Sequence, residues 1–177
     1  TLKWVNRSAS CRTFSKLRLS MLFRVLLATC CLWLSIAGTD SDVVPLQARP
    51  KISDKQMACL VKNAHHEAKG EPVKGRLLVT QVVLNRAKHV DDLCNVVYAK
   101  NQFSWTSQSK RFAKIPKALQ QQYEYEILSM YYGFTHMPEW ADRASHFHAT
   151  CVRPDWSHKF EYLGRIGAHR FYQQTGV

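Results

Sequence analysis

The spacing of apolar residues predicts two consecutive helices, at about 54–69 and from 72 to 86 or 87. In the first, apolar residues recur every three or four positions, as they do on the buried face of a helix. This stripe comprises Met57, Leu60, Val61, Ala64 and Ala68. Gly70 is typical of a helix end, and a proline is tolerated in the first turn of the helix that follows. The two elements are therefore expected to form a helical hairpin.

A third helix is predicted to begin after Pro116 and to end at Gly133. Its apolar positions are Leu119, Tyr123, Ile127 and Met130. Residues 90–115, which precede it, show no sustained period and are expected to form loops and short elements.

Two stretches nearer the C-terminus, 144–150 and 167–172, alternate in the manner of strands. The first is expected to place Ser145, Phe147 and Ala149 on one face and His146 and His148 on the other. The second is expected to place Ala168, Arg170 and Tyr172 opposite to His169 and Phe171. Helices followed by a small β element indicate an α+β domain, mainly helical, at residues 52–177.

Residues 1–37 have the pattern of a signal peptide, with basic residues before the apolar run from Val25 to Ala37 and a polar stretch after it. The thirteen residues of this run are fewer than the ~20 that a bilayer-spanning helix needs. Cleavage and export to the periplasm or the cell wall are therefore expected, with an uncleaved anchor as the alternative. Met21 is a candidate start, with upstream read-through before it, and residues 38–51 are expected to be a polar linker.

The formal net charge of +12 overstates the basic character of the predicted domain. Six of the 25 Lys and Arg residues precede position 38, whereas no Asp or Glu does, so the remainder carries a net charge of +6. A moderate positive charge suits an anionic polymer such as cell wall, nucleic acid or a membrane surface, and does not choose among them.

Export also bears on the cysteines, because three of the six lie beyond the predicted signal segment: Cys59, Cys94 and Cys151. In an oxidising compartment one pair and one remaining thiol are expected. The pair Cys59–Cys94 is favoured, since each of these residues lies at the edge of a predicted helical element. No Cys-x-x-Cys pair occurs, which leaves a structural zinc site with little support.

Among the acidic residues, Glu67 has the position that best suits acid catalysis. It lies at the C-terminal end of the first predicted helix, so it is expected to be half-buried and near the negative end of the helix dipole. Both effects disfavour the ionised carboxylate and raise its pKa, as a general acid that protonates a glycosidic oxygen requires. The alternative is a surface glutamate that pairs with Lys62 or Lys69.

Glu71 lies four residues further on, directly before Pro72. Its default role is to cap the next helix or favour its dipole. The two carboxylates could act together in a retaining enzyme only at a separation of ~5 Å. In an inverting enzyme the separation would have to be ~6.5 to 9.5 Å. The sequence does not give that distance.

Five histidines raise the alternative of a zinc site. They are His65, His66, His146, His148 and His169. A strand would direct the pair at 146 and 148 towards one target. However, Gly70 stands where a metalloprotease helix of the form His-Glu-x-x-His needs its second histidine. Hydrogen bonding to substrate and a place in the core are the other roles open to these residues.

Aromatic residues near these histidines are suited either to stack on sugar rings or to fill a core. They are Trp140, Phe147, Trp156 and Tyr162. The sequence contains no Gly-x-Ser-x-Gly motif, no phosphate-binding glycine loop and no aromatic and basic nucleic-acid ribbon. Cys151 beside a histidine gives little support to a cysteine hydrolase, because a lone cysteine on a strand is usually inert.

Several ordered blocks resemble the SleB/CwlJ family of cell wall hydrolases. The first block, 65–72, contains the signature Glu-Ala-x-Gly-Glu and is followed by Gly75 and by Val82-Val83-Leu84-Asn85-Arg86. The later blocks are Cys94-x-Val96-Val97-Tyr98, Gln102-Phe103-Ser104-Trp105, His146-Phe147-His148-Ala149, Val152-Arg153-Pro154-x-Trp156 and Ile166-Gly167-x-His169-Arg170-Phe171-Tyr172. They cover about residues 57–173 in the order found in the family, which makes the resemblance specific.

The resemblance implies a muramidase-like domain, similar in architecture to lytic transglycosylases, that acts on the glycan strands of peptidoglycan. Glu67 matches the family's catalytic glutamate, which protonates the oxygen between N-acetylmuramic acid and N-acetylglucosamine and then activates the muramoyl C6 hydroxyl. No second catalytic carboxylate, cofactor or metal is implied. The residues expected to bind substrate or support the site are Glu71, Phe103, Ser104, Trp105, His146, His148, Arg153, Trp156 and His169.

Two other functions remain open: a zinc-dependent N-acetylmuramoyl-alanine amidase that uses His146 and His148, and a non-catalytic wall-binding module. The chain departs from the family pattern at Arg76, where glutamine is expected, and at Cys151, where an aromatic residue is more usual. Targeting to the wall is expected to depend on the +6 surface or on an accessory protein. Neither nucleic acid nor stable membrane insertion is expected.

Overall fold

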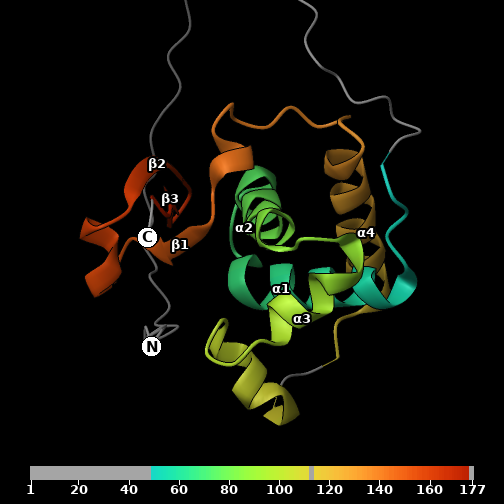
Figure 1. Cartoon of the computed structure of the whole chain (residues 1–177). Coiled ribbons are helices and arrows are strands. Elements are labelled where there is room, and N and C mark those ends of the chain that lie inside the picture. Colours follow the sequence, from blue (N-terminus) through green and yellow to red (C-terminus); the bar gives the residue numbers. More distant parts are fainter. Residues whose placement is uncertain (1–48, 112–113, 176–177) are drawn as a thin grey trace, which may run out of the picture.

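The computed structural model describes residues 49–111 and 114–175 (Figure 1). Its α-helices are α1 (Asp54–Ala68), α2 (Val73–Arg86), α3 (Leu93–Tyr98) and α4 (Lys117–Tyr131). Its strands are β1 (His146–Ala149), β2 (Glu161–Ile166) and β3 (His169–Gln173). Short 3₁₀ helices are η2 (Val90–Asp92), η3 (Ser104–Arg111), η4 (Ala141–Arg143) and η5 (Asp155–His158). The α+β, mainly helical architecture is as predicted.

The N-terminal predictions fall outside this part of the chain. The predicted signal peptide at 1–37 and nearly all of the linker at 38–51 precede the described residues. Within the described ranges, no helix combines the length and apolar character needed to cross a membrane.

The three predicted helices are confirmed as α1, α2 and α4. α1 begins at Asp54, with the Ser53 hydroxyl accepting a hydrogen bond from the backbone N–H of Gln56 at 3.4 Å and with Ile52 buried before it. The sequence did not reveal α3, whose six residues bury only Leu93 and Val97. Six residues are too few to show a helical period, so packing against α1 and α2 defines this helix.

The helical core forms between α1, α2 and α3. Fully buried apolar residues at its centre are Leu60, Val61, Leu77, Leu78, Val79, Val82, Val83, Leu93 and Val97. A disulfide between Cys59 and Cys94 links α1 to α3, as predicted from the sequence. Beside it, the Gln56 side chain donates to the Asp91 carbonyl at 2.6 Å and accepts from the Cys94 N–H at 2.8 Å.

The three strands form an antiparallel sheet in the order β1-β3-β2. β1 and β3 correspond to the two predicted strands, and their faces are as expected. Phe147 lies opposite Phe171 on the inner face, where both are buried against the helices. β2 was not predicted, because none of its residues is fully buried and a bulge near Gly164 interrupts the alternation.

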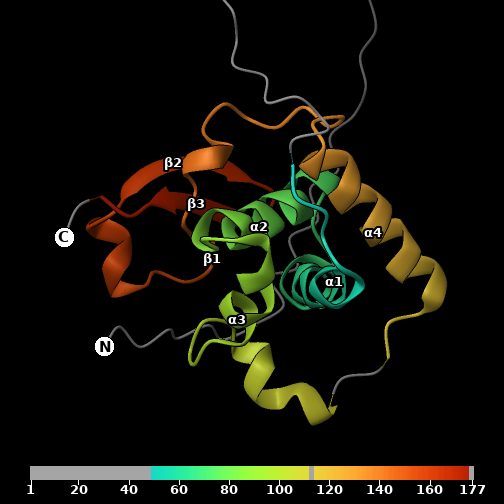
Figure 2. The same ribbon diagram turned by 45° about the vertical axis from the view of Figure 1, so that its right-hand side comes forward.

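Both views place α2 between the sheet and α4 (Figures 1 and 2). Polar side chains at the C-terminal end of α2 fix the start of the sheet. The Asn85 amide donates to the carbonyl oxygens of Ala141 and Ala144 at 2.9 and 2.7 Å, and Arg86 Nε donates to the Ser145 carbonyl at 2.6 Å. The end of one helix therefore sets the entry of β1.

Candidate active site

The C-terminal end of α1 carries Glu67, whose side chain is half-buried, as expected. Three other parts of the fold contact this end of the helix or the turn that follows it. η3 contacts it through Trp105, α4 contacts it through Tyr123, and the turn between β2 and β3 contacts it through Ala168, which donates to Glu71. Glu67 therefore lies in a helical turn that its surroundings hold in place.

Trp105 fixes one side of this turn. Its ring stacks on His66 with 4.7 Å between centroids, and its indole N–H donates to Asn63 Oδ1 at 3.1 Å. Both Trp105 and Asn63 are buried. The neighbouring Phe103 is also buried and faces Phe147. The tripeptide at 103–105 thus reaches the helix end through Trp105, while Phe103 belongs to the core and Ser104 is half-buried.

Arg76 supports another side of the turn. Its guanidinium donates to the Glu71 carbonyl oxygen at 2.7 Å and pairs with Glu126 of α4 at 2.7 Å, where both side chains are 11% exposed. It also lies over the Tyr123 ring, 5.4 Å from the centroid. Tyr123 in turn meets His65 edge to face. Arg76 therefore has a carboxylate partner of its own in α4.

Glu71 joins the turn after α1 to the sheet. Its Oε2 accepts a hydrogen bond from the Ala168 N–H at 2.8 Å, and its Oε1 lies 3.7 Å from His169 Nδ1. Gly167, between the two strands, has φ +59°, and a side chain there would collide with the Glu71 carboxylate. The absence of a side chain allows this close approach.

The predicted helix-capping role of Glu71 is wrong, because the N-terminus of α2 at Pro72 has no side-chain cap. The carboxylate is turned instead towards the backbone N–H of Ala168. Sequence spacing cannot reveal this partner, which is 97 positions away.

The histidines at the helix end are neutral near pH 7. Burial, with smaller effects from His65, Lys69 and Lys62, lowers the pKa of His66 to about 4. Burial and Lys69 lower the pKa of His65. Burial also lowers the pKa of His169, although the Glu71 carboxylate opposes that shift. Positive charge in this neighbourhood therefore comes from Arg76 and the lysines and not from histidines.

The histidine pair of β1 lies elsewhere, on the outer face of the sheet. We use this term for the face that carries His146, His148, Arg170 and Tyr172, which is opposite to the face of Phe147, His169 and Phe171. His148 Nε2 accepts from the Tyr172 hydroxyl at 2.9 Å. His146 packs against Trp156 and Phe160. Both histidines are thus built into a small aromatic cluster.

Burial dominates the electrostatics of this cluster as well. It lowers the pKa of His146 to about 3, with a further contribution from Arg86, and it also lowers the pKa of His148. Across residues 49–111 and 114–175, no group of three or more His, Cys, Asp or Glu side chains is arranged to hold a metal ion. The His-x-His pair therefore has no third ligand within the described residues.

The other predicted contact residues are divided between core and surface. Trp156 is 3% exposed and belongs to the aromatic cluster, whereas Arg153 is exposed beside it. Trp140 packs on Phe171, and Tyr162 is largely exposed. The fold therefore does not gather all the predicted site residues on one surface.

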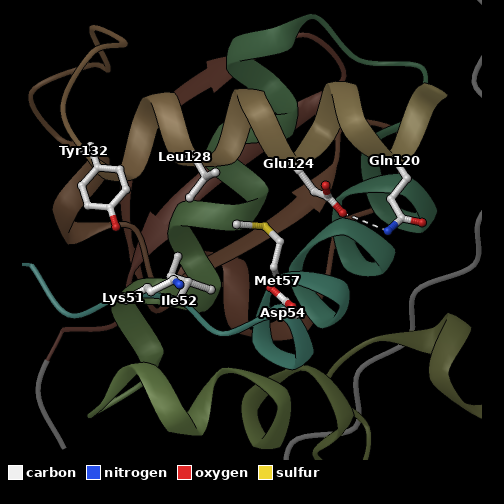
Figure 3. Close-up of a pocket in the computed structure, with 8 residues that line it drawn as sticks. All are labelled: Lys51, Ile52, Asp54, Met57, Gln120, Glu124, Leu128 and Tyr132. Atoms are coloured by element: carbon white, nitrogen blue, oxygen red, sulfur yellow. Dashed lines mark hydrogen bonds between the residues drawn. The ribbon is translucent and has the colours of Figure 1, made fainter. Parts of the chain in front are cut away.

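A cavity among the described residues lies away from Glu67. It has a volume of about 550 Å³ between α4 and the beginning of α1, and Met57 and Leu128 face each other across it (Figure 3). Glu67 is ten residues further along α1 than Met57, which corresponds to ~15 Å at 1.5 Å per residue. This cavity is not part of the candidate active site.

Several residues that support the site were not predicted from the sequence. Asn63 holds Trp105, Arg76 and Glu126 hold the turn after α1, and Arg86 links α2 to the sheet. Asn63 was detectable in principle, because a polar residue next to the apolar stripe of a helix needs a buried partner. The others depend on contacts between distant parts of the chain.

Comparisons with known proteins agree with this architecture. The structure is similar to the catalytic domain of the Bacillus cereus SleB protein, with a TM-score of 0.56, 17% sequence identity, and coverage of 71% of this chain and 94% of that one. It is also similar to the catalytic domain of the germination-specific lytic transglycosylase SleB from Bacillus anthracis, with a TM-score of 0.55, 17% identity, and coverage of 71% and 99%. At this identity the likeness establishes the fold.

No curated protein sequence matches the chain. The sequence model of the Cell Wall Hydrolase family matches residues 70–172, which is more than half of the chain. The matched region includes Glu71, the residues after it in α2, and the whole sheet region up to Tyr172, and it begins three residues after Glu67. The protein therefore belongs to the cell wall hydrolase family.

Proposed function

We propose that this protein cleaves the glycan strands of peptidoglycan as a lytic transglycosylase, with Glu67 as the proton donor. The observation that carries the proposal is the difference between the two signature glutamates. The Glu71 carboxylate accepts from Ala168 and lies next to His169, which ties it to the sheet. Glu67 is half-buried at the C-terminal end of α1, beside the two histidines that Trp105 and Tyr123 contact.

The family implies a peptidoglycan substrate, and the family together with the Cys59–Cys94 disulfide indicates an extracytoplasmic protein. We further propose that residues 52–177 form the catalytic domain, and that residues 1–37 direct export to the periplasm or the cell wall.

The proposed reaction needs one carboxyl group. Glu67 protonates the glycosidic oxygen between N-acetylmuramic acid and N-acetylglucosamine, and the bond from that oxygen to the muramoyl C1 breaks. The resulting carboxylate then takes the proton of the muramoyl C6 hydroxyl, whose oxygen forms a new bond to C1. The products are an N-acetylglucosamine end and a 1,6-anhydromuramoyl end, no water is consumed, and Glu67 is protonated again.

Two further observations support this proposal. The likeness in fold includes a protein described as a lytic transglycosylase. In addition, the histidines next to Glu67 are neutral near pH 7, so neither adds a full positive charge beside the proposed proton donor.

The decisive variant is Glu67→Gln, which keeps the size of the side chain and removes the acid. We expect clearing of a peptidoglycan suspension to slow by at least ~10² to 10⁴-fold, the usual contribution of general acid catalysis, with an unchanged melting temperature. Glu71→Gln is the matched control: it keeps an acceptor for Ala168 and should reduce activity less. Retention of more than a few per cent of activity in Glu67→Gln would remove this residue from the role.

Mass spectrometry of the released fragments identifies the bond. Anhydromuramoyl ends are expected, whereas reducing ends would indicate a hydrolytic muramidase. Free stem peptides, with activity that EDTA abolishes and zinc restores, would instead show a zinc-dependent amidase. A protein that sediments with peptidoglycan but releases no fragments would be a wall-binding module only.

A further inference from the structure

A second cavity lies on the outer face of the sheet, next to the aromatic cluster. It has a volume of about 410 Å³, within the range of ~300 to 1,000 Å³ typical of small-ligand sites. Its histidine, arginine and hydroxyl-bearing lining residues are His148, Thr150, Arg153, Ser157, His158, Arg170 and Tyr172. No acidic residue is among the lining residues, so the cavity has a positive charge.

Strand pairing brings part of this charge together. Arg170 lies between His148 of β1 and Arg165 of β2 in one row across the sheet. Two arginines directly opposite each other on adjacent strands repel, which destabilises a sheet unless an anion lies close to them. Arg153 adds a further guanidinium from the segment after β1.

Arg153 and Arg170, unlike two other arginines of the described residues, have no carboxylate partner. Arg76 pairs with Glu126, and Arg143 pairs with Glu161. Within the described ranges, neither Arg153 nor Arg170 lies within ion-pair distance of an acidic residue. Two guanidinium groups are therefore available to bind an external anion, and planar guanidinium groups bind carboxylate or phosphate with paired hydrogen bonds.

We propose that this cavity is an oxyanion-binding site for the cell wall polymer, with Arg153 and Arg170 as its principal ligands. The inference rests on the proposed function, because that function supplies a polymer rich in such groups. The ligand is a carboxylate of the stem peptides or a phosphate of a wall-linked polymer. Thr150 and Ser157 add hydroxyl donors, and Tyr172 is held in position by His148.

The site is separate from the residues around Glu71. Strand alternation puts Arg170 and His169 on opposite faces of β3, and only the His169 face meets Glu71. Wall binding at this cavity and proton transfer at Glu67 are thus separate functions that different substitutions should remove.

The test measures sedimentation of the chain with peptidoglycan, with Glu67→Gln in every sample so that the polymer stays intact. The double variant Arg153→Gln/Arg170→Gln removes both guanidinium groups from exposed positions. The control, Lys55→Gln/Lys117→Gln, removes the same charge from exposed positions outside the cavity. We expect the arginine variant to bind at least tenfold more weakly at 50 mM salt and the control to bind within twofold of the parent.

Three polymers distinguish the sources of the anion: intact peptidoglycan, peptidoglycan glycan freed of stem peptides, and a poly(glycerol phosphate). Arginine-dependent binding that is lost with the peptides identifies their carboxylates, whereas arginine-dependent binding to poly(glycerol phosphate) identifies phosphate. Equal binding by the arginine variant and the control on all three polymers would overturn the site, provided that circular dichroism shows both to be folded.

Failure of this proposal and failure of the proposed function give different results. If Glu67→Gln keeps its lytic activity while the arginine variant loses binding, the oxyanion site stands and the assigned acid is wrong. If Glu67→Gln is inactive and the arginine variant binds normally, the acid stands and the oxyanion site is wrong.

Discussion

At the scale of single residues, burial determines the charge of the histidines. His146 is surrounded by Trp156 and Phe160 and lies near Arg86, which together lower its pKa to about 3. In the unfolded chain the same residue titrates near ~6.5. Between these values the unfolded state binds a proton that the folded state does not, so this residue destabilises the fold as the pH falls from about 6.5 towards 3.

We predict that His146→Phe makes the stability less sensitive to acid. Phenylalanine preserves the aromatic packing and removes the titrating group. The loss of unfolding free energy between pH 6.5 and 4.5 should be smaller than in the parent by about 1 to 2 kcal/mol, after allowance for partial exposure. Denaturant unfolding at several pH values measures it, and His136→Phe at an exposed position controls for the added ring. Parallel curves for parent and variant would contradict the prediction.

At the scale of elements, the contact between the turn after α1 and the β2–β3 turn joins the helices to the sheet. The Glu71 carboxylate accepts a hydrogen bond from the Ala168 N–H, and Gly167 leaves room for this carboxylate because it has no side chain. A Cβ at Gly167 would also lie 3.0 Å from Pro72 Cδ. The sheet therefore packs against the end of α1 only while position 167 lacks a side chain.

We predict that Gly167→Ala destabilises the protein by about 2 to 4 kcal/mol, because left-handed strain and a steric clash with Glu71 add together. Gly133→Ala is the matched control. Its φ is +82°, but nothing lies within 4 Å of the added Cβ, so strain alone should cost about 1 kcal/mol.

A double variant separates the two contributions. Glu71→Ala by itself should lower the free energy of unfolding by about 1 to 3 kcal/mol, since the partly buried Ala168 N–H loses its acceptor. In the Glu71→Ala background, Gly167→Ala should lower the free energy of unfolding by little more than Gly133→Ala lowers it in the parent. Strictly additive free energies of unfolding would show that Glu71 and Gly167 do not interact.

At the scale of the whole molecule, a disulfide links α1 to α3 across 35 positions of sequence. We predict that reduction, or Cys59→Ala/Cys94→Ala, lowers the free energy of unfolding by about 4 kcal/mol, because the unfolded chain gains freedom. Activity at low temperature should persist, since neither cysteine belongs to the candidate site. Thermal melting with and without reductant measures the effect, and Cys151→Ser at an exposed free cysteine is the control. Peptide mapping that recovers both cysteines as free thiols would contradict the bridge itself.

Periodicity and local chemistry in the sequence were sufficient to predict much of this structure. The period of α1, α2 and α4 predicted three helices, and alternation predicted two of three strands with the correct faces. Glu67 at a helix end and the pair Cys59–Cys94 also followed from sequence. These features depend on residues close together in the chain or on a chemical type that has few partners, which is why a linear pattern contains them.

The tertiary structure alone decided the remainder. Six-residue α3 and bulged β2 exist because neighbouring elements pair with them, and neither has a strong period of its own. The contact of Glu71 with Ala168 joins residues 97 positions apart, so local propensity favoured the wrong partner. Arg153 and Arg170 likewise meet at one cavity only after β3 pairs with β1. The sequence determines which groups are present, and the packing of distant segments determines which of them meet, because contact free energies depend on distances that only the folded chain defines.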